Sequence, residues 1–101
     1  MGFRNAKSRI LTALERGDYS HEPREVQAEK NLLAVGDVTP EFVAGLVRKT
    51  SGRDYQSSPH HADASVEVHI FRASTNDKAR WYVKAYFAPD DATVFISVHP
   101  G

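Results

Sequence analysis

The sequence predicts an α+β fold in which two or three N-terminal helices pack on one face of a three-stranded or slightly larger antiparallel sheet. Two observations lead to this prediction. Apolar residues recur at three- and four-residue spacings over residues 1 to about 50, whereas they alternate over residues 65 to about 99. The chain has 101 residues, the length of one domain, so we expect both halves to share one core.

The first helix is predicted over residues 3 to 16, because its apolar residues lie on one side at helical spacing and Gly17 supplies a C-terminal stop. A second helix is predicted between Ser20 and Gly36, with Pro23 in its first turn. A third helix is predicted to begin after the capping residue Thr39 and to end near residue 49.

Residues 51 to 64 are rich in turn formers and small polar side chains, which predicts a loop. Three runs of period two follow, at residues 65–72, 80–87 and 93–99, with turn-forming residues between them. Because the connections are short, we expect these three strands to form an antiparallel meander.

Alternation assigns the side chains of each strand to two faces of the sheet. We expect the rows that begin at Val66, Trp81 and Val94 to form an apolar face against the helices. The opposite face would then collect Glu67, His69, Phe71, Tyr82, Lys84, Tyr86, Phe95, Ser97 and His99.

Composition excludes several classes of protein. The absence of cysteine excludes disulfides and thiolate metal sites, and no apolar run approaches the roughly 20 residues that cross a bilayer. We therefore expect a cytoplasmic protein that does not bind membranes. Since 13 Lys and Arg balance 13 Asp and Glu, no overall charge favours nucleic acid; RNA must be bound by a local patch, and we expect no binding to DNA by the protein alone.

The mixed face suits metal-independent RNA cleavage, which needs a base, an acid and cations beside the phosphate. His69 and His99, with His60 or His61, are the candidates for proton transfer, and Tyr82, Lys84 and Arg72 could hold the phosphate. The alternative is that these residues are only the solvated face of a two-layer sheet.

A metal site is the third possibility that the histidines raise. His60 and His61, with Asp63 nearby, could join His69 or His99 around zinc, copper or nickel, as in a zinc-dependent hydrolase. Adjacent histidines seldom hold one ion without a third ligand, so we expect neither a metal nor another cofactor.

The segments DYQSS, VEVHIF, WYVKAYF and VFISVH, in this order between Thr39 and His99, resemble the MqsR-type toxins of bacterial toxin–antitoxin pairs. This resemblance implies a RelE-like fold, endoribonuclease activity on messenger RNA and a cognate antitoxin protein. The family's strand tyrosine and following lysine correspond to Tyr82 and Lys84, whereas two family lysines correspond to Gln56 and His99.

We therefore expect a toxin-like endoribonuclease that cleaves single-stranded RNA. The expected RNA-binding residues are Glu67, Arg72, Tyr55, Gln56 and Tyr86. The rival hypothesis is a non-enzymatic antitoxin-like or immunity-like module, because protein interfaces also favour Tyr, Phe and Arg.

Overall fold

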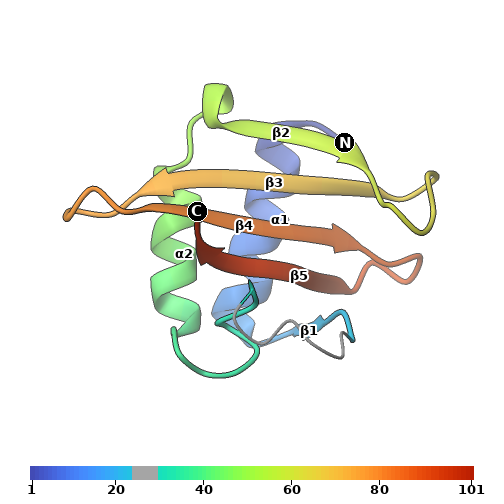
Figure 1. The fold of residues 1–101 in the computed structure, drawn as a ribbon. Helices are drawn as coiled ribbons and strands as arrows, with labels where there is room; N and C mark the ends of the chain where they lie inside the picture. The colour runs from blue at the N-terminus through green and yellow to red at the C-terminus, as the bar shows by residue number, and fades with distance from the viewer. Residues whose placement is uncertain (24–29) are drawn as a thin grey trace.

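The computed structural model describes residues 1–23 and 30–101 and has an α+β fold (Figure 1). Its elements, in chain order, are α1 (Phe3–Arg16), β1 (Tyr19–His21), α2 (Pro40–Lys49), the 3-10 turn η2 (Gly52–Asp54), β2 (Tyr55–Pro59), β3 (Glu67–Ser74), β4 (Arg80–Phe87) and β5 (Thr93–Pro100). None of the helices in these residues is long and apolar enough to cross a membrane.

The described strands form one sheet in the order β1-β5-β4-β3-β2, and α1 and α2 lie side by side behind it (Figure 1). The predicted meander is confirmed, because β3 pairs with β4 and β4 with β5, both antiparallel. The sheet as a whole is mixed, since β1 runs parallel to β5. Both α1 and α2 cover the same face, and no helix in residues 1–23 and 30–101 covers the other.

The predictions for the first and third helices are confirmed. Gly17 ends α1 in the left-handed conformation at φ 68, where a residue without Cβ is favoured. The Thr39 hydroxyl accepts a hydrogen bond from the Phe42 N–H at 3.1 Å and begins α2. Local interactions that the sequence predicts therefore determine where α1 ends and where α2 begins.

The predicted second helix is wrong where the structure describes it. Tyr19–His21 is a strand, residues 30–37 form a bridge and turns, and residues 24–29 of the prediction lie outside the described residues. The Glu22 N–H donates to the Phe95 carbonyl at 2.9 Å, and the Leu32 N–H to the Val98 carbonyl at 2.8 Å. Pairing with β5 supplies the backbone hydrogen bonds that a helix would otherwise have supplied.

The prediction of a loop over residues 51–64 is also wrong in part, because η2 and β2 occupy residues 52–59. β2 pairs antiparallel with β3 from Tyr55 opposite Phe71 to Pro59 opposite Glu67. It is a polar strand at the edge of the sheet, so the apolar alternation that reveals the inner strands is absent.

The main core lies between the helices and the sheet. Its buried members include Ile10 of α1, Val43 and Val47 of α2, and Phe71 and Phe95 of the sheet. The half-buried Trp81 packs against this core, with its ring centroid 4.9 Å from that of Phe42. The helices therefore stabilise the fold by burying the sheet face that carries Phe71 and Phe95.

The expected face of β3 is wrong. Phe71 lies opposite Val83 on the helix side, so Glu67 and His69 share that side, while Val68 and Ile70 point the other way. Both rows of β3 contain apolar residues, and alternation alone does not decide which row meets the helices. The register with β4 decides it, because Phe71 fills the core beside Val83.

β5 departs from strict alternation at an irregularity in its pairing with β4. Lys84 lies opposite Ser97 and Ala85 opposite Phe95, which leaves Ile96 as an extra residue. Val98 faces the helices and His99 faces away, as expected. Phe95 also faces the helices and Ile96 faces away, both against expectation. The extra residue lets the two core residues of β5 share one face despite their spacing of three.

Candidate functional site

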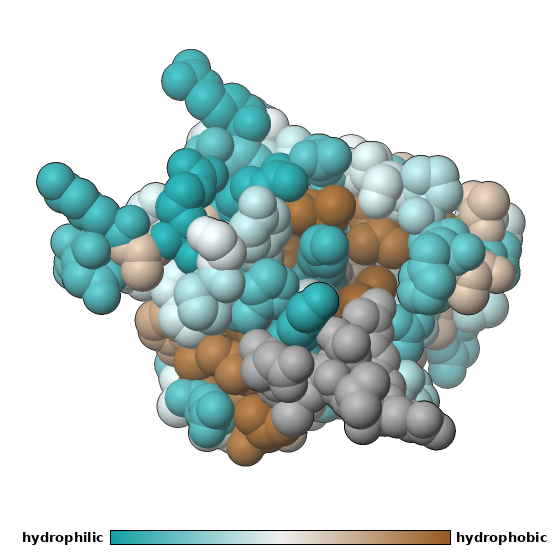
Figure 2. Space-filling view, viewed as in Figure 1, coloured by the Kyte–Doolittle hydropathy of each residue, from teal (hydrophilic) through white to brown (hydrophobic). Residues whose placement is uncertain are grey.

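The open face of the sheet is the face opposite the two helices. Hydrophobic surface shows in gaps between hydrophilic side chains on this face (Figure 2). Val68, Ile70 and Ile96 form its apolar floor, and the half-buried rings of Tyr82 and Tyr86 pack against them. The open face is thus an apolar strip partly covered by two tyrosines.

One end of the open face carries four polar side chains, hereafter the Tyr82 cluster: Gln56, Arg72, Tyr82 and His99. Tyr82 lies opposite Arg72 of β3 and opposite His99 of β5. The rings of Tyr82 and His99 stack with centroids 5.6 Å apart and planes at 27°. The Arg72 guanidinium carbon lies 4.9 Å from the centroid of the Tyr82 ring.

The environment of Tyr82 favours its ionised form. A hydrogen bond from Arg72, and then the positive charge of Arg72, lower the pKa of the Tyr82 hydroxyl, and the charges of Arg80 and Lys84 act in the same direction. Tyr82 is therefore a stronger acid than an ordinary tyrosine.

The hydrogen bonding of His99 determines which nitrogen of the neutral ring carries the proton. His99 Nδ1 lies 2.8 Å from the Pro100 carbonyl oxygen, and a carbonyl can only accept, so the proton is on Nδ1. Nε2 of the neutral ring then has a lone pair for a proton. His99 is half-buried, and its ring lies on an open surface.

Lys84 lies between Tyr82 and Tyr86 along β4, on the same face as both. Two residues along a strand advance about 6.6 Å, so its ammonium group can reach a ligand bound at the Tyr82 cluster. Lys84 forms no ion pair with any residue in the described ranges 1–23 and 30–101. Its charge is therefore available to an anionic ligand.

The other end of the open face is held by a contact between segments at opposite edges of the sheet. Glu22 follows β1, His60 follows β2, and His60 Nε2 lies 2.6 Å from Glu22 Oε1. The ring of Tyr86 meets the edge of His60 at 5.3 Å, and burial, followed by the nearby charge of Glu22, raises the pKa of Tyr86. The Tyr86 hydroxyl therefore holds its proton more firmly than an ordinary tyrosine does.

His60 is unsuited to proton transfer, contrary to expectation. Its Nδ1 accepts from the Ala62 N–H at 3.0 Å while Nε2 faces Glu22, so both ring nitrogens are occupied. The ring is also buried. His61 is exposed and stacks on His60 at 4.7 Å, away from the Tyr82 cluster.

His69 lies on the helix side of the sheet, where the sequence had not placed it. Its side chain is 2% exposed, and the Tyr55 hydroxyl lies 2.6 Å from its Nδ1. Burial lowers the pKa of His69 despite the opposing effect of Glu67, whose Oε1 is 3.8 Å from Nε2. His69, Tyr55 and Glu67 are thus a separate group beside a cavity of about 320 Å³.

Sequence reasoning correctly brings Tyr82, Lys84, Tyr86, Ser97 and His99 to one face, and Arg72 and Gln56 join them there. It does not find Glu22, whose partner His60 is 38 residues away in the chain. No local pattern signals that contact, because pairing across the sheet creates it.

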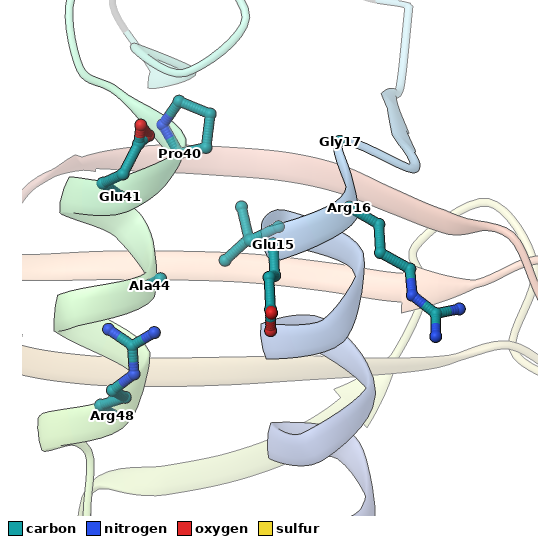
Figure 3. A pocket seen from close by; sticks show the side chains of 8 residues that line it. Glu15, Arg16, Gly17, Pro40, Glu41, Ala44 and Arg48 are labelled. Atoms are coloured by element: carbon teal, nitrogen blue, oxygen red, sulfur yellow. The ribbon is translucent and has the colours of Figure 1, made fainter.

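A groove of about 550 Å³ runs between the C-terminal end of α1 and the length of α2 from Pro40 to Arg48. Glu15 and Arg48 lie on facing sides of it, and Arg16 points away (Figure 3). The groove contains none of the residues that the sequence predicted to be functional, and its opposite charges lie at the surface.

Among the residues that the structure describes, no group of three or more His, Asp or Glu side chains converges as metal ligands would. Comparison of the chain with protein-family models, curated proteins and solved structures finds no match. The function must therefore be argued from the geometry of the open face.

Proposed function

We propose that the chain is a metal-independent endoribonuclease of the toxin type that cleaves single-stranded RNA at the Tyr82 cluster. The observation that supports this most directly is the stacking of His99, whose Nε2 can accept a proton, on Tyr82, whose pKa is lowered by Arg72. A base and an acid side by side on an open surface are what RNA transesterification requires. The resemblance to MqsR-type toxins supports Tyr82 and Lys84, whereas His99 stands where that family has a lysine.

In the proposed reaction, His99 Nε2 removes the proton from a ribose 2′-hydroxyl. The 2′-oxygen forms a bond to phosphorus, the bond from phosphorus to the 5′-oxygen breaks, and Tyr82 gives its proton to that 5′-oxygen. The products carry a 2′,3′-cyclic phosphate and a 5′-hydroxyl, so atoms and charges balance without a further reactant. Histidine exchanges protons near neutral pH, where this step would run.

Two cations would stabilise the additional negative charge on the phosphate in the transition state. Lys84 lies two residues from Tyr82 on the same face, and Arg72 lies against the Tyr82 ring. Cations positioned before the reaction stabilise a developing charge more effectively than water does. We therefore assign Lys84 and Arg72 to the phosphate.

The remainder of the open face suits unpaired bases. Tyr86 presents an aromatic ring four residues from Tyr82, above the floor of Val68 and Ile96. Aromatic rings stack on bases of single strands, which a duplex keeps covered. This favours single-stranded RNA as the substrate.

The test is cleavage of a mixed-sequence single-stranded RNA by the purified protein in EDTA, followed by mapping of the product ends. We expect 2′,3′-cyclic phosphate ends, and rates reduced at least about a hundredfold in His99→Ala and about tenfold or more in Tyr82→Phe. His61→Ala is the matched control and should cleave normally. Equal activity in His99→Ala and His61→Ala would contradict the assignment of the base.

The proposed partner is a cognate antitoxin protein that neutralises the nuclease. We expect expression of the wild-type chain to arrest bacterial growth, expression of His99→Ala to be harmless, and the partner to relieve the arrest. An absence of both cleavage and growth arrest, together with tight binding to another protein, would favour the binding module instead.

A further inference from the structure

Gln56 has one specific partner on the open face. Its Oε1 accepts a hydrogen bond from Arg72 Nη1 at 2.8 Å. Gln56 belongs to the edge strand β2 and lies opposite Ile70 in the register, so this bond runs diagonally to Arg72, two residues further along β3. The exposed Gln56 amide bonds the Arg72 guanidinium, and this guanidinium in turn contacts the Tyr82 ring.

Arg72 is therefore held from two sides, by Gln56 and by Tyr82. A long side chain such as arginine loses much rotamer freedom when it is held in one place, so a single surface contact rarely holds it. The guanidinium has five N–H groups in a rigid plane and can bond two partners at once. The second contact further restricts the Arg72 side chain.

The chemical nature of position 56 matters because an amide is neutral. A carboxylate there would also bind Arg72, but its negative charge would offset the guanidinium charge. Gln56 orients Arg72 and leaves the positive charge to act on the Tyr82 oxygen and on a phosphate.

We propose that Gln56 is a positioning residue that fixes the Arg72 guanidinium against Tyr82 without neutralising it. The placement of Arg72 follows from the hydrogen bonds alone, whereas its effect on RNA cleavage rests on the proposed function. Within the part of the chain that the structure describes, the charged and titratable groups near the Tyr82 hydroxyl are Arg72 of β3, Arg80 and Lys84 of β4 and His99 of β5.

The direct test is titration of Tyr82 by ¹³C NMR of the labelled tyrosine ring, with the Tyr82 signal assigned through Tyr82→Phe. In Gln56→Ala we expect the pKa of Tyr82 to rise toward the ordinary value, by a substantial part of the rise seen in Arg72→Ala. Gln56→Glu should also raise it, because it adds a negative charge. Ser58→Ala, on the same strand and face, is the matched control and should titrate like the wild type.

The second arm is the pH dependence of RNA cleavage. If Tyr82 is the acid, the rate falls at high pH as Tyr82 loses its proton, and Gln56→Ala should move this fall to higher pH. It should also lower the maximal rate by about tenfold to a hundredfold, with KM changed less. Ser58→Ala should reproduce the wild-type profile.

The two arms of the test distinguish three ways in which the proposals could fail. An unchanged Tyr82 titration in Gln56→Ala would overturn the positioning role, whatever happens to RNA. A raised pKa in Gln56→Ala with no cleavage by the wild-type protein would uphold the positioning and overturn the proposed nuclease. A shifted titration with an unshifted cleavage profile would overturn the catalytic effect of Gln56.

Discussion

Replacing Tyr55 with phenylalanine tests whether His69 is structural. The Tyr55 hydroxyl lies 2.6 Å from His69 Nδ1, and the His69 side chain is 2% exposed, so no water can replace the lost donor without rearrangement. Burial, and then the charge of Glu67, raise the pKa of Tyr55, which keeps the hydroxyl protonated and able to donate.

The expected cost follows from what the substitution removes and what it keeps. Phenylalanine retains the ring contacts with Phe3 at 5.1 Å and Phe71 at 5.2 Å, so no large cavity forms. A buried acceptor without a donor costs about 1–3 kcal/mol. We therefore expect Tyr55→Phe to lower the free energy of unfolding by about that amount.

Urea unfolding at pH 7.5, followed by the fluorescence of the single tryptophan, Trp81, measures this cost. Tyr19→Phe is the control, because Tyr19 makes ring contacts but no hydroxyl hydrogen bond within the described residues. Loss of RNA cleavage in Tyr55→Phe with unchanged stability would refute the reasoning. That result would indicate that His69 takes part in proton transfer, as the sequence predicted.

Three further predictions concern stability. Burial lowers the pKa of His69 in the folded protein below its ordinary 6.5, so the unfolded chain binds the proton first as the pH falls. The contribution of His69 to the free energy of unfolding is therefore full above about pH 6.5 and is lost as the pH drops through the lowered pKa. Urea unfolding of His69→Gln should depend less on pH than that of the wild type. His21, whose pKa is also lowered by burial, adds to the same dependence. Glu22→Gln should cost about 1–3 kcal/mol, with a double-mutant cycle against His60→Ala isolating the contact. Thr39→Ala should cost about 1 kcal/mol, measured by thermal unfolding, through loss of the helix cap.

The elements that the sequence predicts well are those whose signals are local. The first helix ends where Gly17 can adopt a positive φ, and α2 begins where Thr39 caps it. The strands β3 to β5 lie within about two residues of the predicted runs, because each carries its own alternation.

The elements that the sequence misses depend on partners far along the chain. β1 has three residues and exists because it pairs with β5, and the polar strand β2 exists because it pairs with β3. The orientation of β3 has the same origin, since Phe71 meets the core only in the observed register with Val83. Period-two patterns locate a strand but do not choose its face when both rows are apolar.

The candidate site follows the same division. Tyr82, Lys84 and Tyr86 are brought together by alternation within one strand, which the sequence displays. The contact between Gln56 and Arg72 needs the unforeseen strand β2, and His69 is removed from the site by the register of β3. Alternation within β4 was sufficient to group its side chains, whereas the register between strands had to come from the structure.

The tyrosines of the open face have two roles that one substitution can separate. Val68, Ile70 and Ile96 are buried although neither α1 nor α2 covers them, and the rings of Tyr82 and Tyr86 pack against them. Phenylalanine at position 82 keeps this cover and removes only the proposed acid, whereas alanine also exposes the apolar floor. Tyr82→Phe should therefore lose cleavage at nearly unchanged stability, and Tyr82→Ala should lose both. Equal loss of stability in the two variants would mean that the hydroxyl serves the fold, and the role of Tyr82 as acid would have to be abandoned.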